Sequence, residues 1–132
     1  MENKEIIEDN KLIAEFMEVK NVREYELNSK HKCLVISDDD GFIDYVEGIN
    51  FLSYNDNWNR IMPVVEKIKK LEFEFNTFSD YTKTEKYRNE VRISELSVDK
   101  YCRILIRNTD MLDAIFNAVV EFIKWYNENK NN

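Results

Sequence analysis

The periodicity of apolar residues changes halfway through residues 57–76, NWNRIMPVVEKIKKLEFEFN, and this change most limits how the chain can fold. In the first part, apolar residues recur at the spacing of one helix face, at Trp58, Ile61, Met62, Val65 and Ile68. From residue 71 onward, apolar and polar residues alternate as in a half-buried strand. The stretch therefore predicts a helix over about 57–71 that passes almost without a linker into a strand over 71–78. Pro63 lies a turn into this helix, and because it lacks a backbone donor it predicts a bend or a late start.

The same two periodicities, of helix and of strand, predict the remaining elements. They are a helix over 3–19, strands over 22–28, 33–37, 42–46, 88–96 and 100–108, and a last helix over about 110–126. The DDDG between the strands at 33–37 and 42–46 contains Asp-Gly, which is a strong hairpin signal. Asn108 or Thr109 is the expected N-cap of the last helix, with Asp110 and Asp113 placed to complement its dipole. In the strand at 100–108, Cys102, Ile104 and Ile106 should share one face, with Tyr101, Arg103, Leu105 and Arg107 on the other.

The fold class predicted from this order is α+β, with three amphipathic helices packed on a mostly antiparallel sheet in an α/β/α sandwich-like arrangement. The length of 132 residues suits a single domain over 1–132. With 43% apolar residues the chain has enough material for a core. Only two glycines and one proline favour long regular elements over a loop-rich barrel.

The charge is unevenly distributed and disfavours bulk attraction to nucleic acid or anionic membrane. The net charge is −7; residues 1–56 hold 14 acidic and 6 basic residues, whereas residues 57–132 hold 12 and 13. The N-terminus is too acidic and polar for a signal peptide, and no stretch reaches the roughly 20 apolar residues of a membrane span. We therefore expect no membrane association and a location in the cytoplasm. In that compartment Cys33 and Cys102, which form no CxxC pair, are expected to be reduced thiols, although a disulfide between them stays open.

No familiar catalytic or metal-binding pattern is complete in this sequence. The loop ISDDDGFIDYVE (36–47) matches most of an EF-hand calcium loop, but Ile36 occupies the first ligand position and a strand is expected where a helix should precede it. An acidic turn explains the same residues better. His31, the only histidine, lies two residues from Cys33 without a third group to orient the pair. With two glycines, nucleotide-binding glycine loops cannot be built. We therefore expect no enzyme activity, no metal and no cofactor.

Two surfaces are candidate binding sites for a partner. Residues 81–107 carry seven basic and four acidic residues, with tyrosines among them. Arginine and tyrosine on a strand can anchor a protein partner or stack and hold nucleic acid, whereas a plain solvated sheet face with cross-strand Arg–Glu pairs would have the same composition. The acidic turn could instead meet a basic groove of a nucleic-acid-binding protein. The candidate residues are Asp38, Asp39, Asp40 and Asp44 in the turn, and Tyr87, Arg88, Arg92, Tyr101, Arg103 and Arg107 in the strands.

Three stretches, NKLIAEFM (10–17), WNRIMPVVEKI (58–68) and IFNAVVEFIKWYNEN (115–129), resemble small uncharacterised proteins of bacteriophages and integrated elements, particularly in Bacteroidetes-type hosts. That group is related to the phage helix–sheet–helix (ABA) sandwich domain. The resemblance implies a three-layer fold and a mobile-element origin, and it brings no catalytic residues. Small acidic phage proteins of this kind are often inhibitors of host defence, including anti-CRISPR proteins.

These observations predict a non-enzymatic phage or mobile-element protein that docks on a larger host protein, such as a CRISPR effector or another nucleic-acid-binding nuclease. The alternative is a small RNA- or DNA-binding module that uses strand residues 87–107. In either case Trp58, Met62, Val65 and Ile68 are expected to pack the middle helix on the sheet. Function should then lie in the acidic turn and the arginine- and tyrosine-rich segment.

Overall fold

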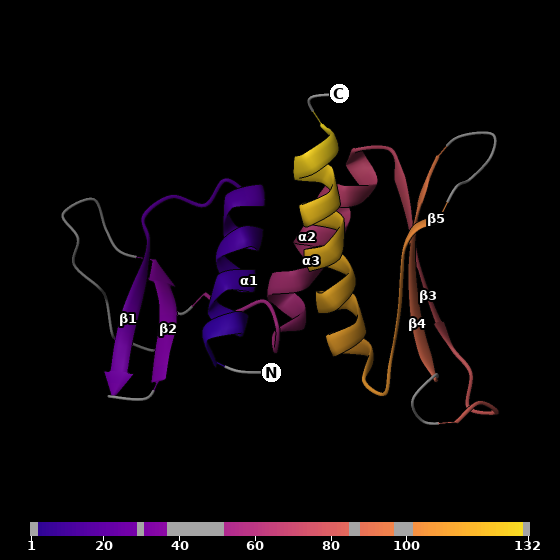
Figure 1. The fold of residues 1–132 in the computed structure, drawn as a ribbon, viewed down its shortest axis with the longest axis horizontal. Coiled ribbons are helices and arrows are strands. Elements are labelled where there is room, and N and C mark those ends of the chain that lie inside the picture. Colours follow the sequence, from indigo (N-terminus) through magenta and orange to yellow (C-terminus); the bar gives the residue numbers. More distant parts are fainter. Residues whose placement is uncertain (1–2, 29–30, 37–51, 85–87, 97–101, 131–132) are drawn as a thin grey trace. The chain divides into compact units, whose positions relative to one another are not determined.

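The computed structural model describes residues 3–28, 31–36, 52–84, 88–96 and 102–130 of the chain (Figure 1). Within these residues, three helices and five strands confirm the predicted α+β class. The strands form two antiparallel sheets instead of the one expected, β1-β2 and β3-β4-β5. Contacts within the chain divide it into two compact units, residues 1–54 and residues 55–132. The single domain expected from the length stays a prediction.

The first unit consists of α1 (Asn3–Phe16), β1 (Val22–Asn28) and β2 (His31–Ile36), with α1 packed against β2. β1 has the predicted bounds, but β2 pairs with β1. The expected partner of β2 across the Asp-Gly turn, residues 42–46, lies outside the described residues together with that turn. Ile13 and Leu34 are buried in this unit. Asn10, also buried, accepts a hydrogen bond from the Tyr54 backbone N–H at 2.9 Å and so fixes the end of the unit to α1.

Helix α1 ends at Phe16, so the predicted helix over 3–19 is three residues too long. Glu18 adopts a left-handed φ of 58°. Its N–H donates to the Glu15 carbonyl, and the Val19 N–H donates to the Ala14 carbonyl, both at 3.0 Å. This is the hydrogen-bond pattern of a Schellman motif, which satisfies the last carbonyls and turns the chain out of the helix.

The second unit has the order α2 (Trp58–Lys70), β3 (Phe73–Ser79), β4 (Asn89–Glu95), β5 (Cys102–Asn108) and α3 (Met111–Asn129). The helix-to-strand change predicted over residues 57–76 is confirmed. The Asn57 side chain caps α2 by accepting from the Asn59 N–H at 3.0 Å. Because α2 begins at Trp58, the late start that Pro63 could have caused does not occur. The cap of α3 is Asp110, which accepts from the Asp113 N–H at 2.9 Å, and not Asn108 or Thr109 as predicted.

The core of the second unit lies between the sheet and its two helices. α3 contacts β4 and β5, α2 contacts β3, and the two helices contact each other (Figure 1). Phe122 at the middle of this core is fully buried, with its ring centroid 4.9 Å from that of Phe73 in an edge-to-face arrangement. The other buried residues on the two helices are Ile61, Val64, Val65, Ile68, Ala114, Ile115, Phe116, Ala118, Val119, Val120 and Ile123.

The packing role predicted for α2 is only half correct. Val65 and Ile68 are buried as expected, but Trp58 and Met62 remain 46% and 39% exposed. Successive helix residues are rotated by about 100°. The buried stripe of α2 consists of Ile61 and of the residues one and two turns further along, Val64, Val65 and Ile68. Met62 lies beside this stripe, and Trp58 lies at its margin in the first turn.

Candidate functional site

Both helices of the second unit lie against the same face of the β3-β4-β5 sheet (Figure 1). Val91 and Ile93 on β4 are fully buried under this covering. Because side chains alternate along a strand, Glu90 and Arg92 belong to the opposite face. We call this opposite face the open face, since no described helix of residues 55–132 covers it.

Two apolar side chains stand out on the open face. Phe78 on β3 is 49% exposed and Leu105 on β5 is 46% exposed. The register places Phe78 opposite Glu90 and Leu105 opposite Arg92. Single exposed apolar residues are ordinary. An aromatic and an aliphatic residue that share a sheet face with arginines have the composition of a protein-binding surface.

Glu90 forms the polar centre of the open face. Its carboxylate is largely buried, and its two oxygens accept hydrogen bonds from Arg92 Nε at 2.7 Å and Arg107 Nε at 2.9 Å. Burial by itself would raise the pKa of Glu90. The hydrogen bonds and charges of Arg107 and Arg92 outweigh burial and lower that pKa below its usual value. The carboxylate is therefore ionised at neutral pH and holds both guanidinium groups in place.

Two of the arginines also lie over aromatic rings. The Arg92 guanidinium carbon is 5.4 Å from the centroid of the Phe78 ring, and that of Arg88 is 5.0 Å from the centroid of the Tyr81 ring. Such contacts are favourable cation–π geometries and hold flat guanidinium groups against the surface. Arg88 precedes β4 by one residue and continues its alternation, so Arg88, Arg92 and Arg107 belong to one face. We call these three residues the arginine cluster.

The connection between β3 and β4 is fixed at both ends near the arginine cluster. The Asp80 N–H donates to the Arg88 carbonyl at 2.8 Å, which extends the pairing beyond the two strands. The Asp80 carboxylate accepts from the Thr82 hydroxyl at 2.6 Å and from its N–H at 3.0 Å. These hydrogen bonds lower the pKa of Asp80 and form a tight turn that contains Tyr81. Tyr81 is 76% exposed.

Asn89 anchors the start of β4. Its buried side chain accepts from the Ser79 hydroxyl at 2.9 Å and donates to the Thr109 carbonyl at 2.7 Å. These two bonds tie the ends of β3 and β5 to β4 at the position where the arginine cluster begins.

Arg103 is separated from the other predicted arginines by an irregularity in the sheet. The register between β4 and β5 shifts after Ile93, which leaves Arg103 as an extra residue in a bulge. Its guanidinium lies over the ring of Trp125 on α3 at 5.2 Å and donates to Glu95 at 3.2 Å. The prediction that Arg103 shares a face with Leu105 and Arg107 is therefore wrong.

The other predicted site residues lie outside the described part of the chain. These are Asp38, Asp39, Asp40 and Asp44 of the acidic turn, and Tyr87 and Tyr101 of the strand segment. Of the ten residues predicted for binding, four are described: Arg88, Arg92 and Arg107 belong to the open face, whereas Arg103 of β5 lies over Trp125 of α3.

The two cysteines are free thiols, so the disulfide left open above is not formed. Cys33 is half-buried, and burial raises the pKa of its thiol. Cys102 is exposed, and its thiol lies 3.2 Å from the Ile104 carbonyl oxygen. The Cys33 thiol therefore lacks the lowered pKa that marks a reactive cysteine.

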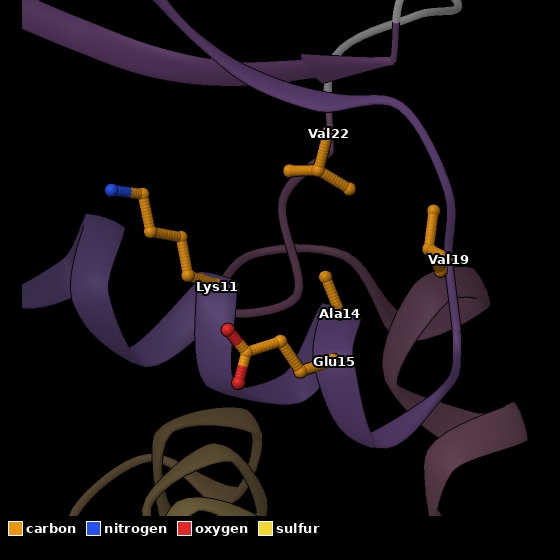
Figure 2. A pocket seen from close by; sticks show the side chains of 5 residues that line it. All are labelled: Lys11, Ala14, Glu15, Val19 and Val22. Atoms are coloured by element: carbon orange, nitrogen blue, oxygen red, sulfur yellow. The ribbon is translucent and has the colours of Figure 1, made fainter.

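The first unit contains a pocket, but this pocket is a weaker candidate for the functional site than the open face. It has a volume of about 160 Å³ and is lined by Lys11, Ala14, Glu15, Val19 and Val22 (Figure 2). Pockets that hold organic ligands are typically about 300–1,000 Å³. Its one amine, on Lys11, is engaged by Glu24 and by Glu8, chiefly through the hydrogen bond to Glu24, and these contacts raise the pKa of Lys11.

Within the described residues, no three histidine, cysteine or carboxylate side chains gather as metal ligands would. None of the helices described has the length and apolarity needed to span a membrane. Comparison of the chain with protein-family models, curated proteins and solved structures found no match.

Three residues of the open face were not among the predicted site residues: Phe78, Glu90 and Leu105. For Phe78 a signal was present in the sequence. Residues two apart on a strand share a face, so Phe78 lies on the same outward face as the polar residues Glu74 and Asn76. For Glu90 the sequence offered only the general alternative of cross-strand Arg–Glu pairs, without indicating its partner. Its role depends on Arg107, which is 17 residues away and is brought near only by the pairing of β4 with β5.

Proposed function

We propose that this chain is a non-enzymatic binding protein that docks on a larger protein through the open face of the β3-β4-β5 sheet. The observation that supports this most is the combination of exposed Phe78 and Leu105 with arginines held by Glu90 on the same face. Aromatic residues and arginine are enriched where binding energy concentrates in protein interfaces. Side chains that are held in place before binding lose little conformational entropy when the partner arrives.

The resemblance to small phage proteins supports a protein of the bacterial host as the partner. Within this proposal, a CRISPR effector or another nucleic-acid-binding nuclease is the specific candidate, and inhibition of host defence is the expected consequence of docking. The net negative charge of the chain resides in residues 1–56, with 14 acidic and 6 basic residues, and complementary charge would accelerate the encounter of this part with a basic surface of such a target.

The experiment is a pull-down from host lysate with the immobilised chain, followed by binding measurements with the purified retained protein. The test variant combines Phe78→Ser with Leu105→Ser. The matched control combines Trp58→Ser with Met62→Ser, which removes two apolar side chains of similar exposure from α2. We expect the control to bind like the wild type and the open-face variant to lose the partner. Equal retention by both variants, or no specific partner for the wild type, would refute the proposal.

A second candidate function is direct binding of RNA or DNA, favoured by the Arg92–Phe78 and Arg88–Tyr81 pairs. Arginine and aromatic side chains on a sheet can stack bases and contact phosphates. Glu90 opposes this function, because an ionised carboxylate at the centre of the face repels a phosphate backbone. A gel-shift titration separates the two functions, since backbone binding weakens steeply with added salt.

A further inference from the structure

The arginine cluster gives one end of the open face a positive charge that is unusual in this chain. Arg92 and Arg107 bind the ionised carboxylate of Glu90, and Arg88 belongs to the same face, so these four residues carry a net charge of +2 in a protein of net charge −7. Around 49% of the Arg92 side chain and 42% of the Arg107 side chain stay exposed beside that carboxylate. Both side chains are therefore partly accessible from the solvent.

The three arginines differ in how firmly they are held. Arg92 and Arg107 each use Nε to bind Glu90, which orients their planar groups. The Nε of Arg88 is buried without an acceptor among the described residues.

The apolar side chains lie next to these charges. Phe78 packs under the Arg92 guanidinium, and Leu105 is the cross-strand neighbour of Arg92. A partner that fits this face must place an apolar group between or beside Phe78 and Leu105 and anionic groups toward the arginines.

We propose that the open face recognises an acidic segment of a protein, in which aspartate or glutamate residues flank an aromatic or aliphatic side chain. This inference rests on the proposed docking function and names the chemistry of the partner. Carboxylates match the planar donor edges of arginine and form short, charge-assisted hydrogen bonds with them. The apolar residue of the segment supplies the water-excluding contact that makes such bonds effective. A nucleic acid would offer phosphates as well, but its closely spaced charges would also approach Glu90.

The test uses yeast-displayed short random peptides sorted for binding to the full purified chain. Enriched peptides are then synthesised, and their affinities are measured with the wild type, Arg92→Gln and Arg107→Gln. Lys124→Gln, an exposed cation on α3, is the control for the loss of one positive charge. The Phe78→Ser plus Leu105→Ser variant reports on docking itself, and circular dichroism verifies that every variant is folded.

We expect enriched peptides to contain acidic residues next to an aromatic or aliphatic residue. Each arginine variant should weaken their binding about tenfold, which corresponds to one or two lost charge-assisted contacts, and Lys124→Gln should leave it unchanged. Replacing the peptide carboxylates by amides should cause a similar loss.

Three other outcomes would overturn parts of the proposal and can be told apart. Peptides that need Phe78 and Leu105 but lack acidic residues, or that bind the arginine variants equally well, overturn the acidic partner and leave docking intact. Peptides that bind the Phe78→Ser plus Leu105→Ser variant unchanged overturn docking through this face. In a competition assay, single-stranded RNA and unlabelled acidic peptide are each used to displace bound acidic peptide. If the RNA does so at a lower concentration than the unlabelled peptide, the proposal of a protein partner is overturned in favour of nucleic acid.

Discussion

Replacing Glu90 with Gln tests the polar centre of the open face most directly. Glutamine keeps the size of the side chain and one carbonyl oxygen, but it removes the negative charge that accepts from Arg92 at 2.7 Å and Arg107 at 2.9 Å. After the substitution, both guanidinium groups would face a neutral amide whose own N–H groups cannot pair with them.

The expected cost follows from the exposure of the partners. Buried hydrogen bonds to charged groups contribute roughly 1.5–3 kcal/mol each, whereas exposed ion pairs contribute only about 0.2–1 kcal/mol. Glu90 is mostly buried, but the arginine side chains are 49% and 42% exposed and can turn back to water. We therefore expect each of the two ion pairs to contribute near the upper end of the range for exposed ion pairs. Glu90→Gln should then reduce the free energy of unfolding by about 1–2 kcal/mol at pH 7.

The pH dependence has a definite sign. The pKa of Glu90 is lower in the folded chain than in the unfolded chain. Its stabilising contribution is therefore complete above the unfolded-state pKa of about 4.3 and is lost as the pH falls through the lower, folded-state pKa. The difference in stability between the wild type and Glu90→Gln should accordingly shrink in acid.

Urea denaturation followed by tryptophan fluorescence provides the assay. Both tryptophans of the chain, Trp58 and Trp125, belong to residues 55–132, so the signal reports on the unit that contains the sheet. Glu66→Gln is the matched control, because it removes an exposed carboxylate that pairs with Lys69 at 3.4 Å. It should cost less than about 0.5 kcal/mol. Equal effects of the two substitutions at pH 7, or a Glu90→Gln effect that grows in acid, would refute the role assigned to Glu90.

Three further changes test the architecture of the second unit by the same denaturation assay. Glu72→Gly should stabilise it by about 0.5–1 kcal/mol, because Glu72 holds a left-handed φ of 72° that glycine adopts without steric cost; no gain would contradict that strain. Asp110→Ala should cost about 1 kcal/mol through loss of the cap to the Asp113 N–H, and Asp110→Asn should retain most of the stability. Phe122→Ala should cost about 3–5 kcal/mol, since a fully buried ring packed on Phe73 is removed, and a cost near 1 kcal/mol would show that the core is not packed as described.

The open face itself was only partly predictable. Its arginines were identified from composition and alternation, because charges of one sign interleaved with apolar residues are visible in a single strand. The bulge at Arg103 was not, because it depends on how β4 and β5 align after Ile93. Neither was the placement of Glu90 between two arginines, which requires residues 90 and 107 to be cross-strand neighbours.

The sequence by itself determined the local elements of this protein, including the passage from α2 to β3, the bounds of β1 and the amphipathic character of α3. These features depend on side-chain periodicity over neighbouring residues, and periodicity is written in the chain. Only the tertiary structure decided that β2 pairs with β1 and that α2 turns Ile61 and not Met62 into the core. The reason is that strand pairing and helix rotation are set by the best burial of contacts between distant segments, which no local pattern contains.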